Sequence, residues 1–322
     1  MALIRFFIAS CLALMLSTQV SAQVFPAKPV TIVVPYAAGG LTDGLARALG
    51  QRLGEKWRVP VIVDNRAGAG TVIGTAAAAR APADGHTLLL TSFGFVANQF
   101  MVPNLPYKSS DLEPLALVAD APSVLFVHPS VPADNVADFV RFIKSSGTPV
   151  AFASSGNGSS PHIAAELFAS KAGARITHVP YRGNGPALND LMGGQVMALF
   201  DSLASMTLVK AGKLKALGIA SAQRSARAPE LVPIAEAGGP AMKGFAAGSW
   251  FGLFVPAATP RALQDKLYAD IASVLNTPDM REAIVKAGVE PALISQAEFA
   301  TYLKAEADRW GPVIRDKNIR AD

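Results

Sequence analysis

The glycine pair Gly39-Gly40 stands where the pattern of the chain changes from strand to helix. It follows an apolar run at residues 30–34, and Leu41 and Leu45 then mark one face of a predicted helix. Glycine lets the backbone approach a ligand closely, and the first N–H groups of a helix have no partner within the helix. The segment is therefore a candidate site for a small anion. Its proposed contact residues are Tyr36, Ala38, Gly39, Gly40 and Thr42.

A second segment of the same design spans residues 151–162 and is rich in serine and glycine. Pro161 suits the first turn of a helix, which predicts a helix start beside several hydroxyl groups. The hydroxyls could bind a ligand, and Ser159 or Ser160 could simply cap the helix; the two interpretations are compatible. Two such loops in separate halves of one chain predict a cleft that holds a ligand from both sides. The proposed contacts from this segment are Ser154, Ser155, Gly156, Ser159 and His162.

Loops after other predicted strands supply further candidates, because the carboxyl ends of parallel strands share one edge of a sheet. Tyr181 could donate a hydrogen bond to a carboxylate or stack on a ring, and Arg182 either pairs with an acidic ligand or stays in solvent. The aromatic residues Phe93, Phe95 and Trp250 either shape the cleft or belong to the core. The remaining proposed contacts are Gly70, Ser92, Gly183 and Asp201.

Two ionisable residues lie in the first turns of the predicted helices. A carboxylate repels an anionic ligand, so we expect Asp43 to stabilise the positive end of its own helix. It becomes a ligand contact only if the ligand carries an ammonium group. For His162, the positive helix end favours the neutral ring, so we expect a hydrogen-bonding wall rather than a base.

The first 22 residues have the composition of an export signal. Arg5 supplies a short positive region, residues 6–16 are apolar, and Val20-Ser21-Ala22 resembles a cleavage site, which predicts cleavage after Ala22. The apolar run is too short to span a bilayer, and no later run reaches spanning length. We therefore expect a soluble, exported chain, located in the periplasm if the host is Gram-negative.

Composition excludes several classes of function. Cys11 is the only cysteine and lies in the predicted signal, so the mature chain would have no disulfide, thiol nucleophile or cysteine-bound metal. The formal net charge of +5 comes without a dense basic run, so nucleic-acid binding is not expected. The four histidines lack metal-ligand spacing. We expect no metal, no cofactor and a monomer.

Cofactor and enzyme motifs are also weak. Gly68 and Gly70 with Gly74 miss the dinucleotide fingerprint by one residue, so we expect close packing of helix on sheet instead. The sequence has neither a G-x-S-x-G nor an H-E-x-x-H motif. Ser159 with His162 leaves a serine hydrolase as an alternative, but no orienting acid stands near them in sequence. The prediction is a protein that is not an enzyme.

Strand-like runs alternate with helical patterns along most of the chain. This rhythm predicts an α/β fold with mostly parallel sheets flanked by helices, and the length predicts two domains. The helical C-terminal part is expected to pack back on the first domain. We therefore predict a discontinuous domain 1 at residues 23–125 and 248–322, an inserted domain 2 at residues 126–247, and a ligand cleft between them. Strands near 118–128 and 246–255 would form a hinge.

Segments in the same order and spacing resemble the substrate-binding proteins of tripartite tricarboxylate transporters, the Bug or TctC-like receptors. The resemblance covers essentially the whole mature chain. This sequence departs from the family pattern at three positions: it has Ala67 where the family often has proline, Thr71 where glycine is common, and Arg182 where lysine is frequent. The matching segments are residues 35–47, 64–74, 83–89, 154–162 and 179–196.

This resemblance implies a two-domain periplasmic receptor of the Venus-flytrap type that closes on a small carboxylated ligand. The ligand would be a di- or tricarboxylate, an acidic amino acid or an aromatic carboxylate, and the receptor would deliver it to a two-component membrane permease. An alternative is a sensory module that docks on a membrane sensor kinase.

Overall fold

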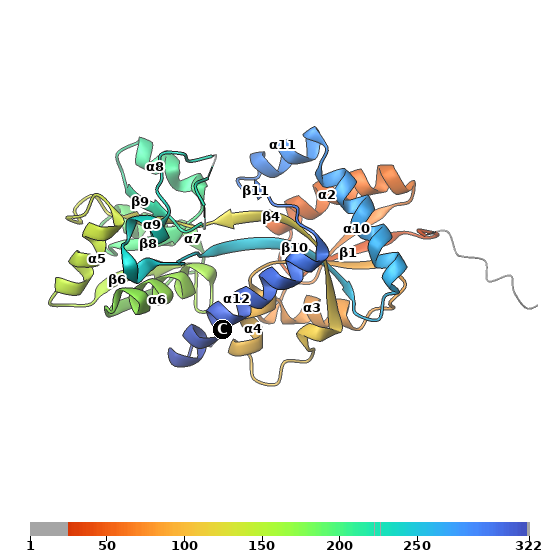
Figure 1. The fold of residues 1–322 in the computed structure, drawn as a ribbon, viewed down its shortest axis with the longest axis horizontal. Helices are drawn as coiled ribbons and strands as arrows, with labels where there is room; N and C mark the ends of the chain where they lie inside the picture. The colour runs from red at the N-terminus through yellow and green to blue at the C-terminus, as the bar shows by residue number, and fades with distance from the viewer. Residues whose placement is uncertain (1–24, 222, 226, 321–322) are drawn as a thin grey trace, which may run out of the picture.

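The computed structural model describes residues 25–221, 223–225 and 227–320. The predicted signal segment and its cleavage site lie outside the described residues. The described chain forms two lobes, each built around one β-sheet (Figure 1). No helix in this part of the chain combines the length and apolar character needed to cross a membrane.

The first sheet has six strands in the order β11-β4-β10-β3-β1-β2. Strand β1 pairs in parallel with β2 and β3, which places the loops after these three strands at one edge. The pairs made by β10 and β11 are antiparallel. The strands are β1 (Val30–Val34), β2 (Val61–Asn65), β3 (Thr87–Thr91), β4 (Leu112–Pro122), β10 (Gly248–Pro256) and β11 (Glu290–Pro291).

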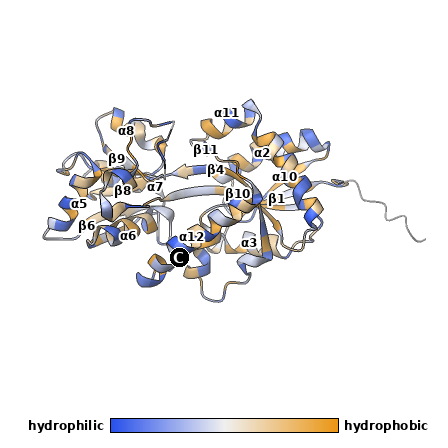
Figure 2. Ribbon diagram, in the orientation of Figure 1, coloured by the Kyte–Doolittle hydropathy of each residue, from blue (hydrophilic) through white to orange (hydrophobic). Residues whose placement is uncertain are grey.

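Helices cover the first sheet, and Figure 2 shows hydrophobic and hydrophilic residues alternating along them, as expected for helices with one face on a sheet. They pack on a core in which Leu45, Leu49 and Leu253 are inaccessible to solvent. The helices are α2 (Leu41–Trp57), α3 (Val72–Ala79), α4 (Gly94–Met101), α10 (Arg261–Leu275), α11 (Pro278–Lys286) and α12 (Gln296–Asp316), with 3₁₀ turns η1 (Ala69–Thr71) and η2 (Ser109–Asp111).

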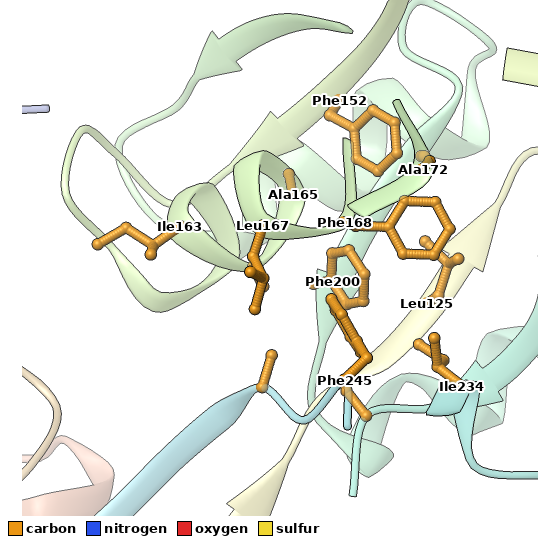
Figure 3. Close-up of a cluster of buried hydrophobic side chains, with 14 of the residues drawn as sticks. Leu125, Phe152, Ile163, Ala165, Leu167, Phe168, Ala172, Phe200, Ile234 and Phe245 are labelled. Carbon is orange, nitrogen blue, oxygen red and sulfur yellow. The ribbon is translucent and has the colours of Figure 1, made fainter. Parts of the chain in front are cut away.

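The second sheet has the order β7-β6-β8-β5-β9, with β6 parallel to β7 and β8, and β5 antiparallel to β8 and β9. Phe152, Phe168, Phe200 and Phe245 fill its core (Figure 3). The elements are β5 (Val124–Val127), α5 (Val136–Ser145), β6 (Val150–Ser154), α6 (Ser160–Ala172), β7 (Ile176–Pro180), α7 (Asn184–Met192), β8 (Ala198–Asp201), η3 (Leu203–Ser205), α8 (Met206–Lys210), β9 (Lys215–Ile219), α9 (Ile234–Ala237) and η4 (Pro240–Met242).

Two chain crossings join the lobes. Strand β4 leads directly into β5, and β10 returns beside β4 (Figure 1). At the crossing, the Ser123 N–H donates to the Ala247 carbonyl at 3.0 Å. A side chain at Gly248 would collide with the Ala121 carbonyl, so only glycine lets the two crossing strands approach this closely.

The predicted α/β architecture with two lobes is confirmed, and both sheets are mixed. Parallel pairing is confined to β1–β3 and β6–β8, because the crossing strands enter each sheet antiparallel. Helix α4 was not predicted. The sequence also predicts that the last helix ends near Trp310, which is wrong, because α12 continues through Pro312. Its end buries Ile314 in a hydrophobic cluster that α4 shares with the second lobe, which offsets the lost helical hydrogen bond. Helix α12 therefore contacts α6 as well as α4.

Candidate ligand-binding site

A cavity of about 450 Å³ lies between the lobes. From the first lobe it is lined by the loops that follow β1, β2 and β3 and by β10, and from the second lobe by the loop between β6 and α6. Eight residues predicted as ligand contacts line it: Tyr36, Thr42, Gly70, Ser92, Phe93, Ser155, Gly156 and Ser159.

Four helices begin at this cavity. Leu41 and Thr42 belong to the first turn of α2, and Ser159 directly precedes α6. Thr71 and Phe93 likewise precede α3 and α4. None of these four helices has a hydrogen bond from its N-cap side chain. Of the other described helices, α5, α11 and α12 are capped by the Asn135, Thr277 and Ser295 side chains, whereas α7, α8, α9 and α10 have no side-chain cap. The cavity is thus bordered by four helix N-termini without a side-chain cap, an arrangement that favours an anion, although in α4 the Phe95 and Val96 N–H groups donate to the Ser92 and Phe93 carbonyls.

Ser159 is of the residue type that usually caps a helix, but its hydroxyl takes another partner. It donates to the Gly156 carbonyl at 2.7 Å. That contact stabilises a tight loop in which Gly156 and Gly158 have φ angles of 133° and 69°. A Cβ on Gly158 would lie 2.7 Å from the Met101 sulfur, so the loop packs directly against α4 of the other lobe.

The loop before α3 contains consecutive residues with positive φ. The angles are 45° at Ala69, 57° at Gly70 and 83° at Thr71, and the last is unusual for a β-branched residue. Asn98, fully buried on α4, holds this loop. Its side-chain amide donates to the Gly70 carbonyl at 2.6 Å and to Thr71 Oγ1 at 3.1 Å. Glycine, which the resembled family frequently has at this position, would adopt this φ without strain.

Among the described residues, none that lines the cavity carries a charged side chain. The polar groups are backbone amides, serine and threonine hydroxyls, two asparagine amides and the phenol of Tyr36. Burial raises the pKa of Tyr36 to about 12, so its hydroxyl is neutral and can donate a hydrogen bond at neutral pH. Phe93, Phe251 and Met101 add an apolar wall.

Asp43 is turned away from the cavity and lines no part of it. Its carboxylate accepts from Arg47 Nε at 3.0 Å and from the Gly39 N–H at 2.8 Å. These two hydrogen bonds hold the pKa of Asp43 below its usual range. Arg47 also donates to Asn65 Oδ1 at 3.1 Å. Asp43 therefore fixes the shape of the first glycine loop, consistent with the predicted role at its own helix end.

Ser154 and His162 contact the second loop but do not line the cavity. The Ser154 hydroxyl is fully buried and lies 2.5 Å from His178 Nε2. The ring of His162 stacks on His178 with centroids 3.6 Å apart, and its Nδ1 accepts from the Gly158 N–H at 3.1 Å. The Ser159 hydroxyl donates its hydrogen bond to the Gly156 carbonyl, whereas the nucleophilic serine of a hydrolase donates to a histidine.

A smaller cavity of about 160 Å³ adjoins the first and is lined in part by Asp201. Tyr181 lines neither cavity: its hydroxyl donates to Asp190 at 2.6 Å, and burial with this carboxylate raises its pKa to about 12. The Gly183 N–H donates to the Ser155 carbonyl at 3.3 Å, which joins the two rim loops.

The other predicted contacts occupy the rim or its support. Ala38, Gly39 and Gly40 are exposed in the loop before α2 but are absent from the cavity walls. Of the aromatic candidates, Phe93 lines the cavity, while Phe95 and Trp250 pack in the core of the first lobe. The described residues contain no group of three or more side chains placed to hold a metal ion.

Several lining residues were not identified from the sequence: Thr71, Asn98, Met101, Ser249 and Phe251. The one available signal was the amide pair Asn98 and Gln99 in the otherwise apolar run at residues 93–101, because a polar residue buried in such a run usually has a hydrogen-bond partner. Ser249 and Phe251 reach the cavity only because β10 crosses between the lobes.

Comparison with known proteins agrees with this architecture. The model of the tripartite tricarboxylate transporter family receptor matches residues 45–319. Protein BugT of Bordetella pertussis is 36% identical over 309 residues, covering 95% of this chain and 94% of that protein. A protein of Pseudomonas sp. (strain P51), from the tcbD-tcbE intergenic region, is 37% identical over 300 residues, covering 92% of this chain and 89% of its own.

Solved structures give the same result. An R. palustris protein with adipate has a TM-score of 0.75 and 33% identity, covering 92% of this chain and 99% of its own. A TctC solute-binding protein from Polaromonas without ligand has a TM-score of 0.82 and 26% identity, covering 91% of this chain and 99% of its own. The chain described here belongs to the tripartite tricarboxylate transporter receptor family.

Proposed function

We propose that this protein is a periplasmic receptor that binds a small carboxylate between its lobes and delivers it to a two-component membrane permease, without chemical conversion. The observation that carries the proposal is the ring of four uncapped helix N-termini around a cavity whose described lining residues are all uncharged. Such a site stabilises an anion with oriented amide dipoles.

Relatives support the carboxylate class. One R. palustris structure is solved with adipate, and MatC from Rhodopseudomonas palustris, 30% identical with a TM-score of 0.71, with bound malate. A cavity of about 450 Å³ suits a ligand of this size. Selectivity would then come from the length and shape of the pocket, since no salt bridge is available to dominate it.

Closure of the lobes is the proposed mechanism. The amides of the α2 and α6 first turns lie on opposite lobes, joined by the crossing strands β4 and β10. A carboxylate held by both turns stabilises the closed form, because only that form satisfies the ligand from both sides. Closure also removes water, which strengthens each amide–carboxylate hydrogen bond.

A thermal-shift and calorimetric screen of the mature protein tests this function. The panel contains dicarboxylates, citrate, amino acids, aromatic carboxylates and neutral sugars. A ligand at a hundred times its dissociation constant stabilises the native state by about 2.7 kcal/mol. We expect stabilisation by one class of carboxylates and none by sugars. Binding of sugars alone, or hydrolysis of an ester analogue, would contradict the proposal.

The variant Gly40→Val tests the first loop. Gly40 has an ordinary φ of −79°, and a Cβ there would meet only the Ala37 carbonyl at 3.5 Å, so the fold should tolerate valine. The added bulk beside Leu41 should lower affinity at least about 10-fold. Gly147→Val is the matched control, since Gly147 is exposed with no neighbour near its Cβ position. Unchanged affinity in Gly40→Val would remove this loop from the site.

A further inference from the structure

The smaller cavity beside the main one differs from it in chemistry. Leu41, Ser155, Ser160, Ser249 and Phe251 line both cavities, so a ligand in the main cavity lies against the same side chains that form the smaller one. The smaller cavity is lined in addition by the end of β8 and the start of α7.

Its distinctive group is the carboxylate of Asp201, at the end of β8. Asp201 is only 5% exposed, yet no lysine, arginine or histidine is among the described residues that line either cavity. Ser205 Oγ donates to one carboxylate oxygen at 2.6 Å, and the Asn184 amide donates to the other. The Ser202 backbone N–H is a third donor to this carboxylate. An ionised carboxylate has about four acceptor sites, so one remains for a ligand. A buried acidic group with neutral donors and no cation can still accept a hydrogen bond.

Asn184 provides a second acceptor. Because its nitrogen donates to Asp201, its oxygen is directed elsewhere, and Asn184 Oδ1 is buried without a hydrogen-bond partner. Buried polar atoms in native proteins are usually satisfied, so this unpaired oxygen at the wall of a cavity indicates a missing donor.

We propose that the smaller cavity is a subsite for a hydrogen-bond-donating substituent of the ligand, so that the protein prefers hydroxy- or amino-carboxylates over plain carboxylates of the same carbon skeleton. The inference rests on the proposed function and deepens it. The ligand carboxylate occupies the uncapped helix N-termini, while Asp201 repels a second carboxylate from the smaller cavity and accepts from a hydroxyl or ammonium group.

The alternative is that Asp201 serves only to fix η3 and the start of α7, whose residues donate to it. In that case its loss would change stability without changing the choice among ligands. The measured quantity must therefore be a ratio of affinities and not a single affinity.

Calorimetric titration of the mature protein with two matched series provides this ratio. The first series is succinate, malate and aspartate; the second is 3-phenylpropionate, phenyllactate and phenylalanine. In the series that binds, we expect the hydroxy or amino member to bind at least about 10-fold more tightly than the plain member, because the plain member leaves buried acceptors unpaired. Equal or tighter binding of the plain member would overturn the subsite while the carboxylate receptor stands. Binding of no carboxylate would reject both.

The variant Asp201→Asn distinguishes a hydroxyl from an ammonium group as the ligand's hydrogen-bond donor. Its amide oxygen still accepts from a hydroxyl but has lost the charge. The preference for an ammonium ligand should therefore fall at least about 10-fold, and that for a hydroxyl ligand by about 3-fold. Either loss supports the subsite and identifies the donor. An unchanged ratio with lowered melting temperature would assign Asp201 a structural role. Asp270→Asn is the control, a partly buried carboxylate that accepts from Trp57 Nε1 at 2.8 Å and lines neither cavity.

Discussion

Asn98 on α4 donates to Thr71 Oγ1 at 3.1 Å, so one helix of the first lobe holds the loop that begins another. Thr71 has a φ of 83°, a conformation that an L-residue with a branched Cβ adopts only under constraint. Both residues line the main cavity. The strain is thus located in the cavity wall and is maintained by a buried amide.

Replacing Asn98 with alanine should loosen this loop. Two acceptors, the partly buried Gly70 carbonyl and the buried Thr71 Oγ1, would lose their donor, which should lower the free energy of unfolding by about 1–3 kcal/mol. Ligand affinity should fall as well, because the loop forms part of the wall. Urea denaturation and calorimetry measure the two effects. Gln99→Ala, at the exposed neighbouring position, should change neither quantity. An Asn98→Ala protein with unchanged stability and unchanged ligand affinity would contradict the role of Asn98 in holding the loop.

Two substitutions at Thr71 separate backbone strain from the hydrogen bond. Thr71→Val keeps the branched shape and the positive φ but removes the acceptor, and it should lower the free energy of unfolding by about 1 kcal/mol. Thr71→Gly also removes the acceptor but relieves roughly 1–2 kcal/mol of strain. Glycine should therefore be the more stable of the two variants by denaturant unfolding. The reverse order would mean that the positive φ carries no strain.

The Asp43 side chain should contribute to stability and not to ligand choice. The Arg47 and Gly39 hydrogen bonds lower its pKa in the folded protein. A lowered folded-state pKa gives stability that is present above the unfolded value near 4 and is lost as pH falls through the folded value. Asp43→Asn should therefore lower the free energy of unfolding at pH 7 by about 1–2 kcal/mol, with the difference shrinking below pH 4.

A second variant, Asp43→Ala, tests the ligand role of Asp43. Asp43→Ala should change affinities for an amino acid and for the matching dicarboxylate by the same factor, since Asp43 lines neither cavity. Selective loss of the amino acid, measured by calorimetry, would instead place an ammonium group at Asp43.

Asp120, on the crossing strand β4, should oppose stability at neutral pH. Burial raises its pKa to about 7, and the neighbouring carboxylates Glu290 and Glu306 add to the shift, against Arg309. Between pH 4 and 7 the folded state keeps a proton that the unfolded state has released. As the pH rises through this range, the free energy of unfolding should therefore fall by up to about 1.4 kcal/mol per pH unit. Asp120→Asn should flatten that slope, while Asp265→Asn, at an exposed position, should leave it unchanged.

The sequence by itself determined the local features of the site. Gly39 and Gly156 adopt positive φ angles that only glycine accepts freely, and Pro161 begins α6 where its fixed φ suits a helix. These preferences act within a few residues, so the loops, the helix starts and the α/β rhythm could be predicted from local patterns.

Tertiary structure decided which groups face the ligand cavity. Ser159 turns its hydroxyl to Gly156 and leaves α6 uncapped, and Asp43 turns back to Arg47. Asn98 and Phe251 come from distant segments that meet the loops only after the sheets assemble. Contacts of this kind depend on the packing of elements far apart in the chain, for which a single sequence carries no local signal. The physical reason is that backbone conformation is set by neighbouring residues, whereas a cavity wall is set by the relative placement of whole elements.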